Sequence, residues 1–191
     1  LNITSGGTTT FGETTLTGNL EVTSAQDIKQ TGASNIAGTT DLTSTNGDIT
    51  LDDEENVFGG KVTANGDNVT IAANGDLDAD ITASGDANLT SGGTMVANLD
   101  VEGNSTLTSG GNMTVEGSST DLNITSGGTT TFGETTLKGN LDVTSSLVMT
   151  QPPPISTPVP TAPPFRSGDI TLDDEENVFG GQVTADGDNV T

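Results

Sequence analysis

Hydrophobic residues along the chain recur in pairs separated by one residue, and the pairs are divided by short polar segments. A spacing of two places both side chains on one face of an extended strand. The polar segments, such as "SGG", "TNGD" and "EGN", hold residues that favour tight turns. No stretch keeps a period of 3.6, so the pattern predicts many short strands and no helices. The pairs are Leu20/Val22, Ile49/Leu51, Val69/Ile71, Leu99/Val101, Met113/Val115, Leu122/Ile124 and Leu141/Val143.

Two long segments occur twice, both at an offset of 121 residues. Each pair of copies differs at only two positions, and the pairs are 1–24 with 122–145 and 47–70 with 168–191. The sequence therefore predicts one full long repeat over residues 1–121 and a partial second repeat over residues 122–191.

Near-identical repeats indicate units that pack mainly on their neighbours, as in solenoids. Small and aliphatic inward residues suit a narrow core, and abundant Thr suits the outward positions of strands. We expect an all-β fold, a parallel β-helix (β-solenoid) that forms an elongated rod. With coils of roughly 20 residues stacked about 4.8 Å apart, the first repeat makes about six coils and the chain roughly nine. Another β fold and a mostly disordered chain are the alternatives.

Composition limits the function. The 191 residues carry a net charge of −23, only 29% of them are hydrophobic, and Cys is absent. Low hydrophobicity with high charge is also typical of disorder, which keeps that alternative open. The lack of a basic patch argues against nucleic acid. No apolar run reaches the roughly 20 residues of a membrane-spanning helix, so we expect no membrane insertion. Without Cys, a disulfide scaffold and a thiolate metal site are excluded.

The segment "GDITLDDEENVFGGKVTANGDNVTI" resembles a segment common in filamentous-haemagglutinin-like adhesins, which are large bacterial surface proteins often exported by two-partner secretion. The runs "GNLEVTS" and "GNSTLTSGGNMTVEG" are similar to the repeat rungs of that family. The resemblance implies a right-handed parallel β-helix shaft, an extracellular or cell-surface location and a role in adhesion. The motif "N-x-F-G-G-x-V" occurs here as Asn56, Phe58, Gly59, Gly60 and Val62, and again as Asn177, Phe179, Gly180, Gly181 and Val183.

Catalysis is not expected. Without His or Cys, the chain cannot build Ser–His or Cys–His machinery. A polysaccharide-degrading β-helix enzyme is a remote alternative because carboxylates are plentiful. Such sites usually need aromatic platforms and cations, and the chain has five Phe and four Lys plus Arg. We therefore predict that the protein is not an enzyme and carries no catalytic residues.

The run "LDDEEN" occurs twice and is the weak candidate for a metal site. Carboxylate oxygens are calcium ligands, but consecutive residues converge on one ion only in a loop. A solvated acidic loop is the simpler interpretation. Apart from calcium, we expect no cofactor. The candidate ligands are Asp52, Asp53, Glu54, Glu55, Asp173, Asp174, Glu175 and Glu176.

Seven N-x-[ST] sequons are candidate glycosylation sites if the chain is exported. Because Ser and Thr are so common, several are expected by chance. The sequons start at Asn2, Asn68, Asn88, Asn104, Asn112, Asn123 and Asn189.

Threonine triplets at Thr8–Thr10 and Thr129–Thr131 raise the question of a regular Thr ladder, as on an ice-binding face. Such a ladder needs Thr at equivalent positions of successive rungs. The hydrophobic pairs are unevenly spaced, so the sequence predicts no ladder.

All seven prolines lie within residues 146–167, which replace residues 25–46 of the first repeat without changing the offset. Proline cannot donate ladder hydrogen bonds, so one interpretation is a polyproline-like loop. The other is an aberrant rung that arose by a local frameshift. Read one frame over, codons for Pro154–Thr161 are compatible with a sequence similar to "NIAGTTD" at Asn35–Asp41.

The leading hypothesis is a structural repeat segment of a secreted bacterial surface adhesin or extracellular fibre, acting as a rigid shaft. The alternative is a carbohydrate- or protein-binding β-helix module that contacts a host glycan or protein. We expect the chain to associate with itself end to end, or within a longer fibre, because a cut rod exposes an unpaired rung.

Overall fold

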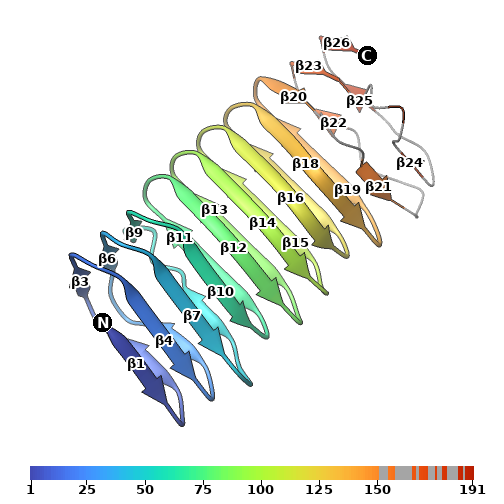
Figure 1. The fold of residues 1–191 in the computed structure, drawn as a ribbon. Helices are drawn as coiled ribbons and strands as arrows, with labels where there is room; N and C mark the ends of the chain where they lie inside the picture. Colours follow the sequence, from blue (N-terminus) through green and yellow to red (C-terminus); the bar gives the residue numbers. More distant parts are fainter. Residues whose placement is uncertain are drawn as a thin grey trace.

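The computed structural model describes residues 1–150, 155–157, 165–166, 168–171, 175, 178–179, 185–186 and 188–191. The chain winds into about nine coils that stack into a straight rod, with the two termini at opposite ends (Figure 1). All strand pairs are parallel, and none of the described residues is helical. The prediction of an all-β parallel β-helix is confirmed. The described residues therefore include no helix that could cross a membrane.

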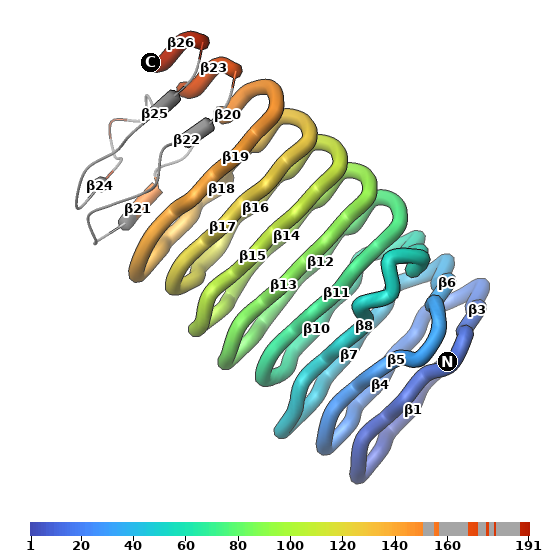
Figure 2. Tube along the Cα trace, turned by 180° about the vertical axis from the view of Figure 1, so that it is seen from behind, coloured from blue at the N-terminus to red at the C-terminus, as the bar shows by residue number. Residues whose placement is uncertain are grey.

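Two long sheets form the broad faces of the rod, and a short third sheet lies along one edge of its first coils (Figure 2). Sheet A contains β1 (Asn2–Ser5), β4 (Leu20–Ser24), β7 (Thr40–Ser44), β10 (Val62–Gly66), β12 (Leu77–Ala83), β14 (Met95–Val101), β16 (Met113–Ser119), β18 (Thr130–Leu137), β20 (Val148–Thr150), β21 (Ile155–Thr157), β23 (Asp169–Ile170), β24 (Val178–Phe179) and β26 (Asn189–Val190). Sheet B contains β2 (Thr9–Phe11), β5 (Ile28–Gln30), β8 (Ile49–Leu51), β11 (Val69–Ala73), β13 (Ala87–Ser91), β15 (Ser105–Ser109), β17 (Leu122–Ser126), β19 (Leu141–Ser145), β22 (Phe165–Arg166) and β25 (Ala185–Asp186). Sheet C contains β3 (Thr14–Leu16), β6 (Ser34–Ile36) and β9 (Val57–Phe58).

The core follows directly from the alternating sequence. In β12 and β14 every second residue is buried, and the residues between them face outward. Ile81 of β12 pairs with Leu99 of β14, and both are at most 3% exposed. Stacking aliphatic residues in this way buries apolar surface along the whole rod axis, which stabilises the fold.

Coil length varies along the rod. Thr40 pairs with Val62, 22 residues further on, whereas Val62 pairs with Ala79 after only 17. The longer coils come first and include the strands of sheet C, which ends at β9. From β10 to β19 the coils contribute strands to sheets A and B alone.

The repeat offset of 121 residues spans six and a half coils. Six successive strand pairings connect Ile3 to Gly117 along sheet A. The repeat counterpart of Ile3 is Ile124, which lies half a coil after Gly117, in β17 of sheet B. A residue of sheet A or B in the first copy therefore has its counterpart on the other of these two sheets, and residues of β3 and β9 in sheet C have theirs in sheet A. The pairings are Ile3–Val22, Val22–Leu42, Leu42–Ala64, Ala64–Ile81, Ile81–Leu99 and Leu99–Gly117.

The described parts of residues 146–167 take part in the solenoid. Met149 pairs with Thr130, and Ile155 pairs with Thr135, and both Met149 and Ile155 are fully buried. Arg166 pairs with Thr144 of sheet B. The seven prolines lie outside the described residues. Both interpretations of residues 146–167, a proline-rich loop and an aberrant rung, stay predictions.

An irregularity interrupts the pairing of β16 with β18 between Val115 and Gly117. Gly117 has φ = 107°, the only positive-φ glycine in the described part of the chain. A side chain there would also collide with the backbone carbonyl oxygen of Leu99 on the preceding coil. Glycine is required at this position for both reasons.

We expect Gly117→Ala to lower the free energy of unfolding by about 2 kcal/mol or more, because it adds backbone strain and a steric clash. Urea denaturation measures the change. The control is Gly75→Ala, since a Cβ at Gly75 meets nothing within 4 Å. The control should change stability by less than about 0.5 kcal/mol. Equal effects of both variants would contradict this account of Gly117.

Candidate functional site

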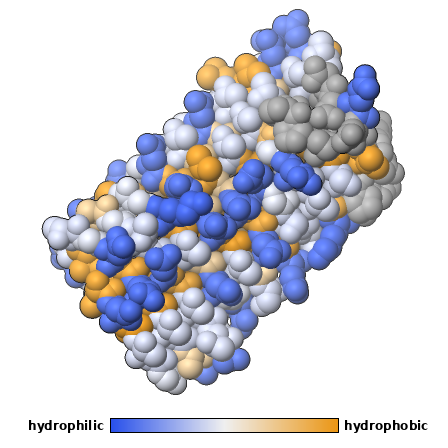
Figure 3. Space-filling view, in the orientation of Figure 1, coloured by the Kyte–Doolittle hydropathy of each residue, from blue (hydrophilic) through white to orange (hydrophobic). Residues whose placement is uncertain are grey.

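The outward face of sheet A is strongly acidic. From β4 to β18, seven outward residues of its strands carry carboxylates, and hydrophilic side chains are spread along the face that they form (Figure 3). The nearby cation Lys61 lies 3.8 Å from Asp78 and 3.9 Å from Asp80, a half-exposed arrangement that contributes little to stability. The seven carboxylates are Glu21, Asp41, Asp78, Asp80, Asp100, Glu116 and Glu134.

The outward face of sheet B is chemically different. From β13 to β19 its outward residues are Thr and Asn, with one carboxylate, Asp142. They form two columns in register, one of which reads Thr90–Thr108–Thr125–Thr144 and the other Asn88–Thr106–Asn123–Asp142. A Thr ladder therefore exists, and the expectation that none would form is wrong. Coils of 17 to 19 residues bring these side chains together although their spacing in the sequence is uneven.

A third feature is a ladder of Asp and Asn side chains in the turns that enter sheet B. In each turn a backbone N–H donates to the side-chain Oδ1 of the residue one coil earlier, at distances of 2.6 to 3.2 Å. The bonds run along the rod axis and fix the stacking of successive turns. The ladder consists of Asp27, Asp48, Asn68, Asp86, Asn104, Asp121 and Asn140.

Asp27, at the start of this ladder, also bonds Lys29, with 2.8 Å between Oδ2 and Nζ. This bond, together with the N–H of Asp48, lowers the pKa of the Asp27 carboxyl below its ordinary value. The Asp27 carboxylate, in turn, raises the pKa of the Lys29 ammonium. Both groups are therefore charged across the neutral range.

Asn56, directly after the acidic run, is fully buried and joins four segments. Its Oδ1 accepts from the N–H of Ser34 at 2.7 Å and from Nε2 of Gln30 at 3.1 Å. Its Nδ2 donates to the carbonyls of Leu51 and Ala72 and to Oε1 of Gln30, each at 3.1 Å. These bonds hold the loop of residues 52–56 against β8 and β11.

The acidic run itself forms a turn on the surface rather than a metal cage. Asp52, Glu54 and Glu55 are exposed, and Asp53 Oδ1 accepts from the N–H of Glu55 at 2.9 Å. Within the described residues, no three acidic side chains gather closely enough to hold a metal ion. In the second copy Glu175 is exposed, while Asp173, Asp174 and Glu176 lie outside the described residues. The calcium hypothesis stays a prediction.

The seven sequons fall into two structural groups, and all seven Asn are exposed. Four lie on strands, namely Asn2, Asn88, Asn123 and Asn189, and three lie in turns, namely Asn68, Asn104 and Asn112. On a strand, N-x-T places Asn and Thr side by side with x buried, so the β pattern itself generates sequons. In the turns, the Asn Oδ1 already accepts a backbone bond from the next coil. Glycosylation stays a prediction for all seven.

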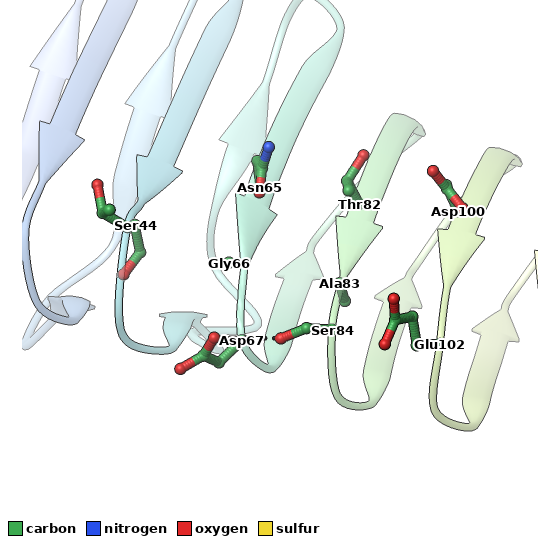
Figure 4. Close-up of a pocket in the computed structure, with 10 residues that line it drawn as sticks. Ser44, Asn65, Gly66, Asp67, Thr82, Ala83, Ser84, Asp100 and Glu102 are labelled. Carbon is green, nitrogen blue, oxygen red and sulfur yellow. Dashed lines mark hydrogen bonds between the residues drawn. The ribbon is translucent and has the colours of Figure 1, made fainter.

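Two shallow hollows open on the side of sheet A. One, of about 270 Å³, is lined by residues of several coils, among them Asp67, Asp100 and Glu102 (Figure 4). Ser84 Oγ donates to Asp67 Oδ1 at 3.1 Å within it. The other, of about 380 Å³, surrounds Gly117. Both are lined by carboxylates together with Ser and Thr hydroxyls, Thr82 and Ser84 in the first and Ser118 and Thr136 in the second.

We expect Asn56→Ala to lower the free energy of unfolding by about 3 kcal/mol or more, because it leaves the Ser34 N–H and two carbonyls buried without partners. Urea denaturation measures this change. The matched control is Asn74→Ala, which alters an exposed side chain on the adjoining coil. The account fails if the two variants are equally stable.

The Asp27–Lys29 pair predicts a pH dependence. Because the folded-state pKa of Asp27 is lowered, its contribution is present above the ordinary value of 3.8 and is lost as pH falls through the folded-state pKa. Because the pKa of Lys29 is raised, its contribution holds below 10.5 and is lost as pH rises through the folded-state pKa. The stability difference between wild type and Asp27→Asn should therefore be constant near neutral pH and shrink in acid. Thermal unfolding across pH measures it, and a difference that grows in acid would contradict the assignment.

Comparison with known proteins places the chain in a repeat family. Residues 1–65, 66–117 and 119–186 each match the family described as "Repeats of unknown function (DUF5649)". No curated protein and no solved structure gives a significant match. The three matched segments, which follow one another along nearly the whole chain, correspond to about three coils each. With stacked parallel coils and three consecutive matches, this chain belongs to the family of repeats of unknown function (DUF5649).

Proposed function

We propose that this chain is a shaft segment of a secreted bacterial surface adhesin or extracellular fibre, and that it acts as a stiff spacer without catalytic activity. The observation that carries the proposal is the uninterrupted stacking of coils across the junction between the two repeats. β15, β17 and β19 pair in full register on either side of residue 121. A repeat can therefore be added without creating a new domain boundary.

The mechanism of such a shaft is geometric. Each coil extends the rod by one strand spacing, about 4.8 Å, so nine coils give a length of roughly 40 Å. Backbone bonds and the Asp/Asn ladder run along the axis, where they resist bending and separation of coils. A surface rich in carboxylates keeps neighbouring rods apart and soluble.

The extracellular or cell-surface location rests on the resemblance to filamentous-haemagglutinin-like segments and on the acidic, cysteine-free composition. Within the same proposal, rods associate end to end. Strands β1, β2 and β3 each pair on one side only among the described residues, so their other edges can accept strands of another copy.

Adding a second copy of residues 1–121 in tandem tests the spacer function. We expect the rod to lengthen by six and a half coils, about 31 Å, with an unchanged cross-section. Small-angle X-ray scattering measures both quantities. A tandem insert of the same composition in scrambled order is the control and should not extend the rod. A longer chain that scatters as two separate bodies, or that keeps its original length, would overturn the proposal.

A further inference from the structure

Strands β13, β15, β17 and β19 lie side by side along the rod (Figure 2). Their outward face, here called the threonine face, is a regular array of polar groups, of which all but Asp142 are uncharged. Neighbouring side chains repeat about 4.8 Å apart along the rod axis and roughly 6.7 Å apart along each strand. The array holds Thr90, Thr106, Thr108, Thr125 and Thr144 together with Asn88 and Asn123, and Asp142 lies at its end.

The polar groups of this face are not used within the protein. None of its Thr hydroxyls or Asn amides makes a side-chain hydrogen bond to any described residue. The turn ladder is different, because Asn104, in the turn that leads into β15, accepts a backbone bond. The threonine face therefore offers donors, acceptors and methyl groups, all available to a ligand.

We propose that the threonine face is a docking surface for an uncharged, hydroxyl-rich polysaccharide. Charge decides the class of ligand. With a net charge of −23, the protein repels sulfated or uronic-acid chains, while a cationic partner is drawn to the seven carboxylates of sheet A. An uncharged chain gains no Coulomb attraction from sheet A, and close contact there would remove water from the carboxylates. It finds on the threonine face hydroxyl and amide groups at regular intervals.

The mode of binding is repetition of weak contacts. The buried Phe11, Phe58 and Phe132 offer no aromatic platform to a sugar ring. Each Thr contributes one hydroxyl and one methyl group, so a single sugar unit binds weakly. Affinity comes from many units bound along one rod, because each contact raises the effective concentration for the next. Spacer and docking functions are independent, since the spacer function needs only the stacked coils.

A second copy of the chain is a poorer occupant. Four strands of five residues cover roughly 300 Å². A stable protein–protein interface buries about 800 Å² on each partner. The loop of residues 52–56, held by Asn56 against β8 and β11, limits extension of a flat contact toward the N-terminal coils.

The test is co-sedimentation of the intact 191-residue chain with microcrystalline cellulose, an uncharged polysaccharide, and with insoluble polygalacturonate, a charged one. We expect retention by cellulose alone. The triple variant T106V/T108V/T125V should bind cellulose at least about thirtyfold more weakly, at roughly three- to tenfold for each of the three hydroxyls lost. Val keeps the shape and the branched β-carbon of Thr, so the strands should still form.

The matched control is T43V/T63V/T82V, which makes the same change at three exposed positions of sheet A. It should bind cellulose like the wild type, with circular dichroism confirming that both variants are folded. Absence of cellulose binding, equal losses in both variants, or preference for polygalacturonate would overturn the proposal. If the wild type does not bind cellulose, two further results would also contradict the proposal. One is a wild-type dimer that T106V/T108V/T125V abolishes, and the other is slowed ice growth by the wild type.

Discussion

Register between coils is the constraint on which the rest of the structure depends. A strand that slipped by one residue would turn its buried side chains outward. The backbone bonds fix this register. The Asp/Asn ladder reinforces it from the turns, since each Oδ1 accepts from the backbone N–H of one particular residue on the next coil. The core, the threonine face and the acidic face all follow from this one alignment.

The two repeats show that register outweighs local sequence. Residues 9–16 and 130–137 are identical, yet the first copy forms two strands in different sheets, β2 and β3, and the second forms the single strand β18. The neighbours differ, because β2 and β3 pair with β5 and β6, whereas β18 pairs with the seven-residue β16. A coil therefore takes the shape of the coil beside it. Repeats of half-integral length are tolerated for the same reason.

Much of the fold was predictable, because alternation and turn residues are local signals. The pairs Leu20/Val22 and Leu122/Ile124 are buried in strands as their spacing indicates. The threonine face was not predictable, since it depends on the number of residues in each turn. Thr90, Thr108 and Thr125 align only because successive coils are 18 and 17 residues long.

The acidic loop illustrates the same limit for a site. The run of carboxylates at Asp52–Glu55 indicated a candidate metal site, but the residue that organises the loop is the neutral Asn56 that follows them. The signal that could have identified it is the repeated motif "N-x-F-G-G-x-V", in which Asn is followed by buried Phe58. Predicting its partners needed the fold, since Gln30, Ser34 and Ala72 lie on other coils.

The distribution of charge over the two faces has a consequence for any assembly of such rods. Carboxylates a few ångströms apart repel one another, so an acidic face weakens the rod and resists contact with other rods. The stacked core offsets this repulsion because its apolar burial runs the full length of the described coils. Among the described coils, the threonine face has its single carboxylate, Asp142, at one end, so a large uncharged surface can approach the rest of it closely without desolvating charges. The proposed docking function uses this separation of the two chemistries onto opposite sheets, because contact on sheet B leaves the carboxylates of sheet A in water.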